Sequence, residues 1–128
     1  MIILIDTSTS TCYLTLVSDQ AQKTYEWEAG RTLARDLLGY LRDRLLEQGL
    51  SFHDISGIGI MKGPGSFTGL RIGMAVMNTL ADGLDIPIVG EQGEHWQKQA
   101  LNRLNRNEND QIVLPEYGTE AHITKPRK

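Results

Sequence analysis

The chain has 128 residues with 40% apolar and 23% charged side chains, which suits one ordinary globular domain. Its net charge of −3 gives no overall attraction to nucleic acid or to a membrane surface. A single cysteine, Cys12, excludes an internal disulfide, and no run approaches the roughly 18 apolar residues of a membrane span, so we expect a cytoplasmic protein without membrane contact.

The first part of the chain predicts three antiparallel strands. Residues 2–5, IILI, form a continuous apolar run that ends at Asp6, the pattern of a strand buried on both faces. A turn of small hydroxyl residues, TSTST, follows it. Alternating side chains then predict strands over 13–17 and 23–28. The short turns between these strands indicate a meander.

The rest of the chain predicts helices that alternate with strands. Leucines at four-residue intervals indicate an amphipathic helix that stops at Gly49. A later helix is expected to begin after Ser66, which is a favourable N-cap. The expected elements are a helix over 33–46, a strand over 55–61, a helix over 67–83, a strand over 86–89 and a helix over 91–104.

This order of elements predicts a mixed five-stranded sheet. Helical crossovers make the later strands parallel to the first, while the opening meander is antiparallel. The result is the α/β arrangement of the ribonuclease-H-like domain, which the actin-like ATPases share. We expect this domain over residues 1–106. The remainder, 107–128, is expected to be a polar loop and a C-terminal tail, with a weak strand signal from Ile112.

Asp6 stands where ribonuclease-H-like nucleases hold a metal ligand, but companion carboxylates are missing. Two-metal chemistry needs several carboxylates around ions that lie about 4 Å apart. The strand over 55–61 ends in Met61 and is followed by Lys62, with no acid. The three histidines lack the close helical spacing of a metal pair. We therefore predict no catalytic residue and no bound metal, and expect Asp6 to brace the TSTS turn.

Residues 62–73, KGPGSFTGLRIG, resemble a phosphate-binding loop without matching one. A P-loop requires lysine after its glycines, and the dinucleotide fingerprint requires glycine where Thr68 stands. The start of a helix can still attract an anion through its free N–H groups. The weak candidate for an anion or nucleotide contact consists of Asp6, Gly65, Ser66 and Thr68.

The helix after Ser66 is apolar on nearly every side, which predicts contacts on every side. An interior helical glycine costs roughly 1 kcal/mol relative to alanine, yet Gly69 and Gly73 lie one turn apart. Either the helix over 33–46 fills this space within the fold, or a helix of another protein does. We favour a partner interface, formed by Leu37, Leu41, Gly69, Gly73, Met74 and Met77. Replacing Gly73 by leucine is then expected to weaken association and to leave the fold intact.

Two stretches resemble one protein family. MIILIDTSTSTCYLTL and KGPGSFTGLRIGMAVMNTLADGLDIPIVG are closely similar to the N-terminal domain of the TsaB (YeaZ) family, which functions in bacterial tRNA threonylcarbamoyladenosine biosynthesis. The resemblance covers mainly residues 1–90. Members of that family are usually nearly twice as long, so we expect their second domain to be almost wholly missing here.

The resemblance implies an inactive relative of the actin-like ATPases. Such a protein would be a scaffold for the TsaD-like catalytic subunit, which modifies the adenosine beside the anticodon of tRNA. It implies a dimer contact built from the first two helices, which would give a homodimer when the chain is alone. It also implies contact with a TsaE-like ATPase and with tRNA only through the complex.

The same resemblance assigns ATP and a metal ion to the partner subunits and no cofactor to this chain. Two alternatives remain open. One is a small nucleotide-binding or metal-dependent enzyme that uses Asp6 and the turn over 63–69. The other is a diverged copy without function.

Overall fold

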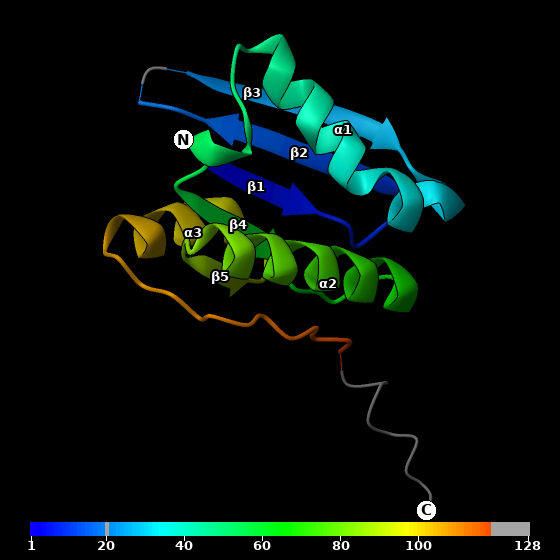
Figure 1. The fold of residues 1–128 in the computed structure, drawn as a ribbon. Helices are drawn as coiled ribbons and strands as arrows, with labels where there is room; N and C mark the ends of the chain where they lie inside the picture. Colours follow the sequence, from blue (N-terminus) through cyan, green and yellow to red (C-terminus); the bar gives the residue numbers. More distant parts are fainter. Residues whose placement is uncertain (20, 119–128) are drawn as a thin grey trace, which may run out of the picture.

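The computed structural model describes residues 1–19 and 21–118, and its five strands form one mixed sheet (Figure 1). The strands are β1 (Ile2–Asp6), β2 (Thr11–Val17), β3 (Gln22–Glu28), β4 (Gly57–Met61) and β5 (Ile88–Glu91). Their order is β3-β2-β1-β4-β5. Because β1 pairs antiparallel with β2 and parallel with β4, the predicted meander and crossovers are both present. The predicted ribonuclease-H-like, actin-like arrangement is therefore confirmed.

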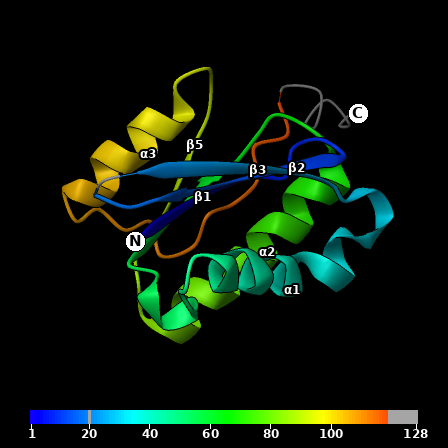
Figure 2. The same ribbon diagram turned by 90° about the horizontal axis from the view of Figure 1, so that it is seen from above.

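Helices cover both faces of this sheet (Figure 2). On one face α1 (Leu33–Glu47) and α2 (Phe67–Leu84) lie side by side, and α3 (Trp96–Asn105) lies on the other face. Two short 3-10 helices, η1 (Gly30–Thr32) and η2 (Phe52–Asp54), flank α1. None of the helices in the described part of the chain is long and apolar enough to cross a bilayer.

The alternation of side chains along β1 divides the core into two layers. Ile3 and Ile5 belong to the cluster beneath α1 and α2, where the leucine stripe of α1 is buried as its spacing predicted. Leu4 belongs to a second cluster with Val89 and the apolar side of α3. Both faces of this central strand are therefore covered, which explains its unbroken apolar sequence.

The helix ends follow local signals in the sequence. The Ser66 hydroxyl accepts a hydrogen bond from a backbone amide of the first turn at 3.1 Å, so Ser66 caps α2 as predicted. Gly49, with a φ of +73°, follows the end of α1. α3 begins at Trp96 rather than at Glu91, because β5 runs through Glu91 and Gly93 turns the chain with a φ of +90°.

Residues 107–118 contain no helix or strand, yet they pack against the domain. Val113 is only 3% exposed and belongs to the core cluster beneath α1 and α2. The Asp110 amide donates to the Ile88 carbonyl at 2.8 Å, which seals part of the outer edge of β5. The packed domain therefore extends past the expected boundary at residue 106. The part of the predicted tail over 119–128 lies outside the described residues.

The guanidinium of Arg103 holds the segment over 107–118 against α3 and β5. Arg103 forms ion pairs with Glu91 at 2.9 Å, with Glu108 at 2.7 Å and with Asp110. Burial alone would raise the pKa of Asp110, but hydrogen bonds from Arg103 and from the Gly90 amide outweigh it and hold that pKa below its ordinary value. The hydrogen bond from Arg103 also lowers the pKa of Glu108.

Candidate functional site

Two turns meet at the edge of the sheet where β1 and β4 end. In the β1–β2 turn, Asp6 Oδ1 accepts hydrogen bonds from the Ser8 amide at 2.8 Å and from the Ser8 hydroxyl at 2.6 Å. In the β4–α2 turn, the Ser66 amide donates to the Ser8 carbonyl at 2.7 Å. Asp6 therefore braces its own turn, and that turn holds the start of α2.

The glycines of the KGPGSFTGLRIG stretch leave room for the β1–β2 turn. A Cβ added to Gly65 would lie 2.5 Å from the Ser8 Cβ. At Gly69 it would collide with the Thr7 carbonyl, and at Gly73 with the Thr7 hydroxyl. Thr7 is fully buried, and its hydroxyl donates to the Gly69 carbonyl at 2.8 Å. The two helical glycines thus admit the chain's own turn, and the prediction that they admit a partner helix is wrong.

The two turns also bring together the weak candidate for an anion contact, which consists of Asp6, Gly65, Ser66 and Thr68. The amides of Ser8, Ser66 and Gly69 are each engaged in a hydrogen bond within the two turns. Within residues 1–19 and 21–118, no group of three or more His, Cys, Asp or Glu side chains could hold a metal ion. The arrangement gives nucleotide or metal binding no specific support.

The residues predicted for partner contact are mostly core residues. Five of the six are buried between the helices and the sheet: Leu37, Leu41, Gly73, Met74 and Met77. Gly69 is half-buried, and it faces Thr7. α2 is apolar on most sides because the sheet and α1 cover two of them. The buried five cannot form an interface in the folded chain, so their assignment is wrong.

An apolar groove instead runs along the outer side of α1 and α2, and we call it the α1–α2 groove. It has a volume of about 520 Å³ and is lined by Leu38, Ala75, Val76, Thr79, Leu80, Gly83 and Leu84. Leu38 is 46% exposed. On α2 the lining residues recur as adjacent pairs every four positions, which forms a second stripe beside the buried one. The sequence contained this stripe, but periodicity alone does not show which stripe of such a helix faces the core.

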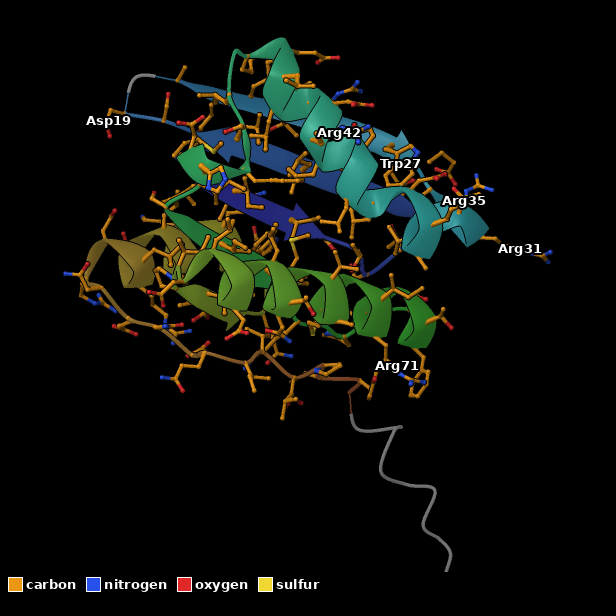
Figure 3. The ribbon with its side chains drawn as sticks, in the orientation of Figure 1. Asp19, Trp27, Arg31, Arg35, Arg42 and Arg71 are labelled. Atoms are coloured by element: carbon orange, nitrogen blue, oxygen red, sulfur yellow. The ribbon has the colours of Figure 1, made fainter. Side chains whose placement is uncertain are left out.

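Two arginines lie on the exposed side of α1, outside the set of residues that line the α1–α2 groove. Arg35 and Arg42 stand one turn before and one turn after Leu38, and Figure 3 shows both extending from α1 into solvent. Arg35 pairs with Asp36 at 2.9 Å, and Arg42 pairs with Asp43 at 3.1 Å. The apolar lining of the groove itself is the feature typical of an interaction site.

Comparison with known proteins agrees with the fold. Residues 27–114 match the family model described as TsaD: tRNA N6-adenosine threonylcarbamoyltransferase. The chain is 33% identical over 110 residues to the tRNA threonylcarbamoyladenosine biosynthesis protein TsaB of Escherichia coli (strain K12), an overlap of 80% of this chain and 47% of that protein. The protein of the same name from Haemophilus influenzae is 32% identical over 125 residues, which is 97% of this chain and 52% of that protein.

A solved structure shows the same likeness. YeaZ from Pseudomonas aeruginosa superposes with a TM-score of 0.66 at 32% identity, and the match covers 71% of this chain and 43% of that chain. The chain thus spans about half the length of the relatives that it matches.

Proposed function

Because the chain belongs to the TsaB (YeaZ) family, we propose that it is a non-catalytic scaffold subunit in tRNA threonylcarbamoyladenosine biosynthesis. In this proposal it binds and stabilises a TsaD-like catalytic subunit as a heterodimer in the cytoplasm. A TsaE-like ATPase joins the same assembly, and tRNA is reached only through the complex. Alone, the chain covers the same surface by forming a homodimer.

The observation that carries this proposal is the α1–α2 groove. Ala75, Thr79 and Gly83 form a ridge of small residues at four-residue spacing along its floor. Beside it runs a ridge of larger apolar residues, which consists of Val76, Leu80 and Leu84. Helices pack by laying the ridge of one into the groove of another at separations of about 8–10 Å. The low ridge therefore suits a partner helix, and a helix pair from the partner would complete a four-helix bundle.

The proposed interface is therefore assigned to a different stripe of residues on the same two helices. The residues proposed for it are Leu38, Ala75, Val76, Thr79 and Leu80, in place of the buried Leu37, Leu41, Gly73, Met74 and Met77. Leu38, Ala75 and Val76 directly adjoin the buried candidates in sequence but face another way, since adjacent residues of a helix differ by about 100° in direction.

Matched substitutions in the two helices test the contact. Ala75→Arg places a charged side chain on the exposed floor of the groove, so binding to the TsaD-like subunit should be lost. Leu46→Arg is the control, because Leu46 is 61% exposed on α1 but does not line the groove. Light-scattering mass measurements should show a heterodimer for the control and separate subunits for Ala75→Arg. Equal binding by both variants would overturn the proposed contact.

The engaged amides of Ser8, Ser66 and Gly69 in the β1–β2 and β4–α2 turns support the non-catalytic role. With these amides bonded within the protein, we propose that ATP and the metal ion belong to the partner subunits. Calorimetric titration of ATP and magnesium into the isolated chain should give no saturable heat. Micromolar binding that is lost on Asp6→Ala would favour a nucleotide-binding enzyme instead.

A further inference from the structure

The segment over 112–117 lies in a second groove, formed by α2, the β4–α2 turn and β5, which we call the Asn78 groove. Asn78 Nδ2 donates to the Val113 carbonyl at 2.9 Å, and the Val113 amide donates to Asn78 Oδ1 at 2.9 Å. The Glu116 amide donates to the Lys62 carbonyl at 2.7 Å. The segment is therefore held largely through its main chain, as extended peptides are held in peptide-recognition sites.

The shape of the Asn78 groove selects side chains by position. A Cβ added to Gly90 would collide with the Val113 side chain, and one added to Gly63 would collide with the main chain of the segment. Val113 is buried, while its neighbours Ile112 and Leu114 are 65% and 71% exposed. This alternation is that of an extended strand with one anchor residue. The groove thus accepts a valine-sized anchor and leaves the flanking positions free.

An aromatic contact closes the far end of the Asn78 groove. The Tyr117 ring stacks on the Phe67 ring with centroids 4.4 Å apart. The Arg71 guanidinium lies 5.4 Å from the centre of the same Phe67 ring, at the start of α2 (Figure 3). Stacked aromatic pairs add to affinity beyond the area that they bury. The segment held here is extended, with a β-branched anchor and an aromatic residue four positions later.

The connection to the rest of the chain is conformationally unfavourable. Residues 108–110 are fixed to the domain by Arg103 and by β5. Gln111, with a φ of +67°, then directs the chain into the Asn78 groove. Side chains other than glycine rarely adopt such a φ, and glutamine is not among the residues that tolerate it well. If the segment left its own groove, Gln111 could return to a more favourable φ.

We propose that the Asn78 groove is a peptide-binding site that also takes the segment over 112–117 from a second copy of this chain. Both halves of the contact are present in every copy, so exchange needs no new surface. Asn78 and Leu80 lie on opposite flanks of α2, since two residues of a helix turn through about 200°. This association is therefore separate from the α1–α2 groove and goes beyond the proposed scaffold function.

Mixing two full-length variants tests the exchange, and both carry Ala75→Arg to remove association through the α1–α2 groove. One adds Asn78→Ala, which disables the groove, and the other adds Val113→Asp, which disables the segment. Each alone lacks one half of the contact, but the mixture holds one intact groove and one intact segment. Native mass spectrometry should show a dimer only in the mixture. A monomeric mixture, or equal dimers in the separate samples, would overturn the proposal.

A labelled peptide of residues 111–118 tests the groove directly. It should bind the Val113→Asp chain saturably and about tenfold more weakly once Asn78→Ala is added, because two hydrogen bonds are lost. Equal binding to both chains would overturn the assignment. If Val113→Asp does not fold, Val113→Ala replaces it, because it removes the buried anchor without burying a charge. Success or failure here is independent of TsaD binding, since every sample is tested without that subunit.

Discussion

At the scale of single residues, the contact between Thr7 and Gly73 sets how closely α2 approaches the sheet. The Thr7 hydroxyl occupies the space that a side chain at position 73 would need, while it donates to the Gly69 carbonyl. The two glycines each cost the helix roughly 1 kcal/mol in propensity. That cost is offset by the close approach of a buried, hydrogen-bonded turn.

Gly73→Ala and Gly83→Ala should therefore change stability in opposite directions. At Gly73 the new methyl group meets Thr7, and overpacking of this kind destabilises by about 1–3 kcal/mol. At Gly83, in the same helix, nothing lies within 4 Å, so alanine should stabilise by about 0.5–1 kcal/mol. Urea denaturation of the two variants measures both effects. If Gly73→Ala were as stable as wild type, the packing described for Thr7 would be incorrect.

The Cys12 thiol should be unreactive in the native protein. Burial, followed by the nearby negative charge of Asp6, raises the pKa of Cys12 to about 12. The reactive thiolate is therefore nearly absent at pH 8. Ellman's reagent should label the folded chain very slowly and the urea-unfolded chain at once. Rapid labelling without denaturant would show that β2 opens readily.

At the scale of elements, the outer edge of the sheet at β5 is covered by the chain's own C-terminal segment. The edge of β5 is bonded by the segment that follows α3, and Arg103 ties that segment down. Because the folded-state pKa values of Asp110 and Glu108 lie below their ordinary values, the ionised forms add stability above about pH 4. This stability is lost as the pH falls through the lowered folded-state values.

Arg103→Gln should destabilise the protein at pH 7 by roughly 1 kcal/mol, a modest amount because the ion pairs are partly exposed. At pH 3 the gap between variant and wild type should narrow, because protonated carboxyls no longer favour the guanidinium. Free energies of unfolding from urea titrations at the two pH values check this. A gap that does not change with pH would show that Arg103 acts through packing alone.

At the scale of the whole molecule, the α1–α2 groove is the proposed site of self-association when no other subunit is present. Leu38→Glu should shift the chain from dimer to monomer, because it places a charge among apolar lining residues. Leu46→Glu, on the same helix but outside the groove, should leave the dimer intact. Sedimentation measurements over a concentration series distinguish the two. Since both leucines are exposed, each variant should keep its fold, and a monomeric wild type would refute the proposal.

Local sequence signals determined the elements of this protein. The apolar run of β1, the leucine spacing of α1 and the Ser66 cap each act over a few residues, so each could be recognised without knowledge of the rest of the chain. The glycine-rich stretch likewise indicates the family by its sequence alone.

The tertiary structure alone decided which side of α2 is the surface. The sequence of a helix that is apolar on nearly all sides does not show which side faces the core. The elements that pack against it in the fold determine that side. Thr7 lies 62 positions before Gly69 in the chain, and it packs against the side of α2 that carries Gly69 and Gly73. That side of the helix is therefore the inner one. The covering of β5 by residues 107–118 was equally hidden, because main-chain contacts with Asn78 leave almost no pattern in the side chains of the segment.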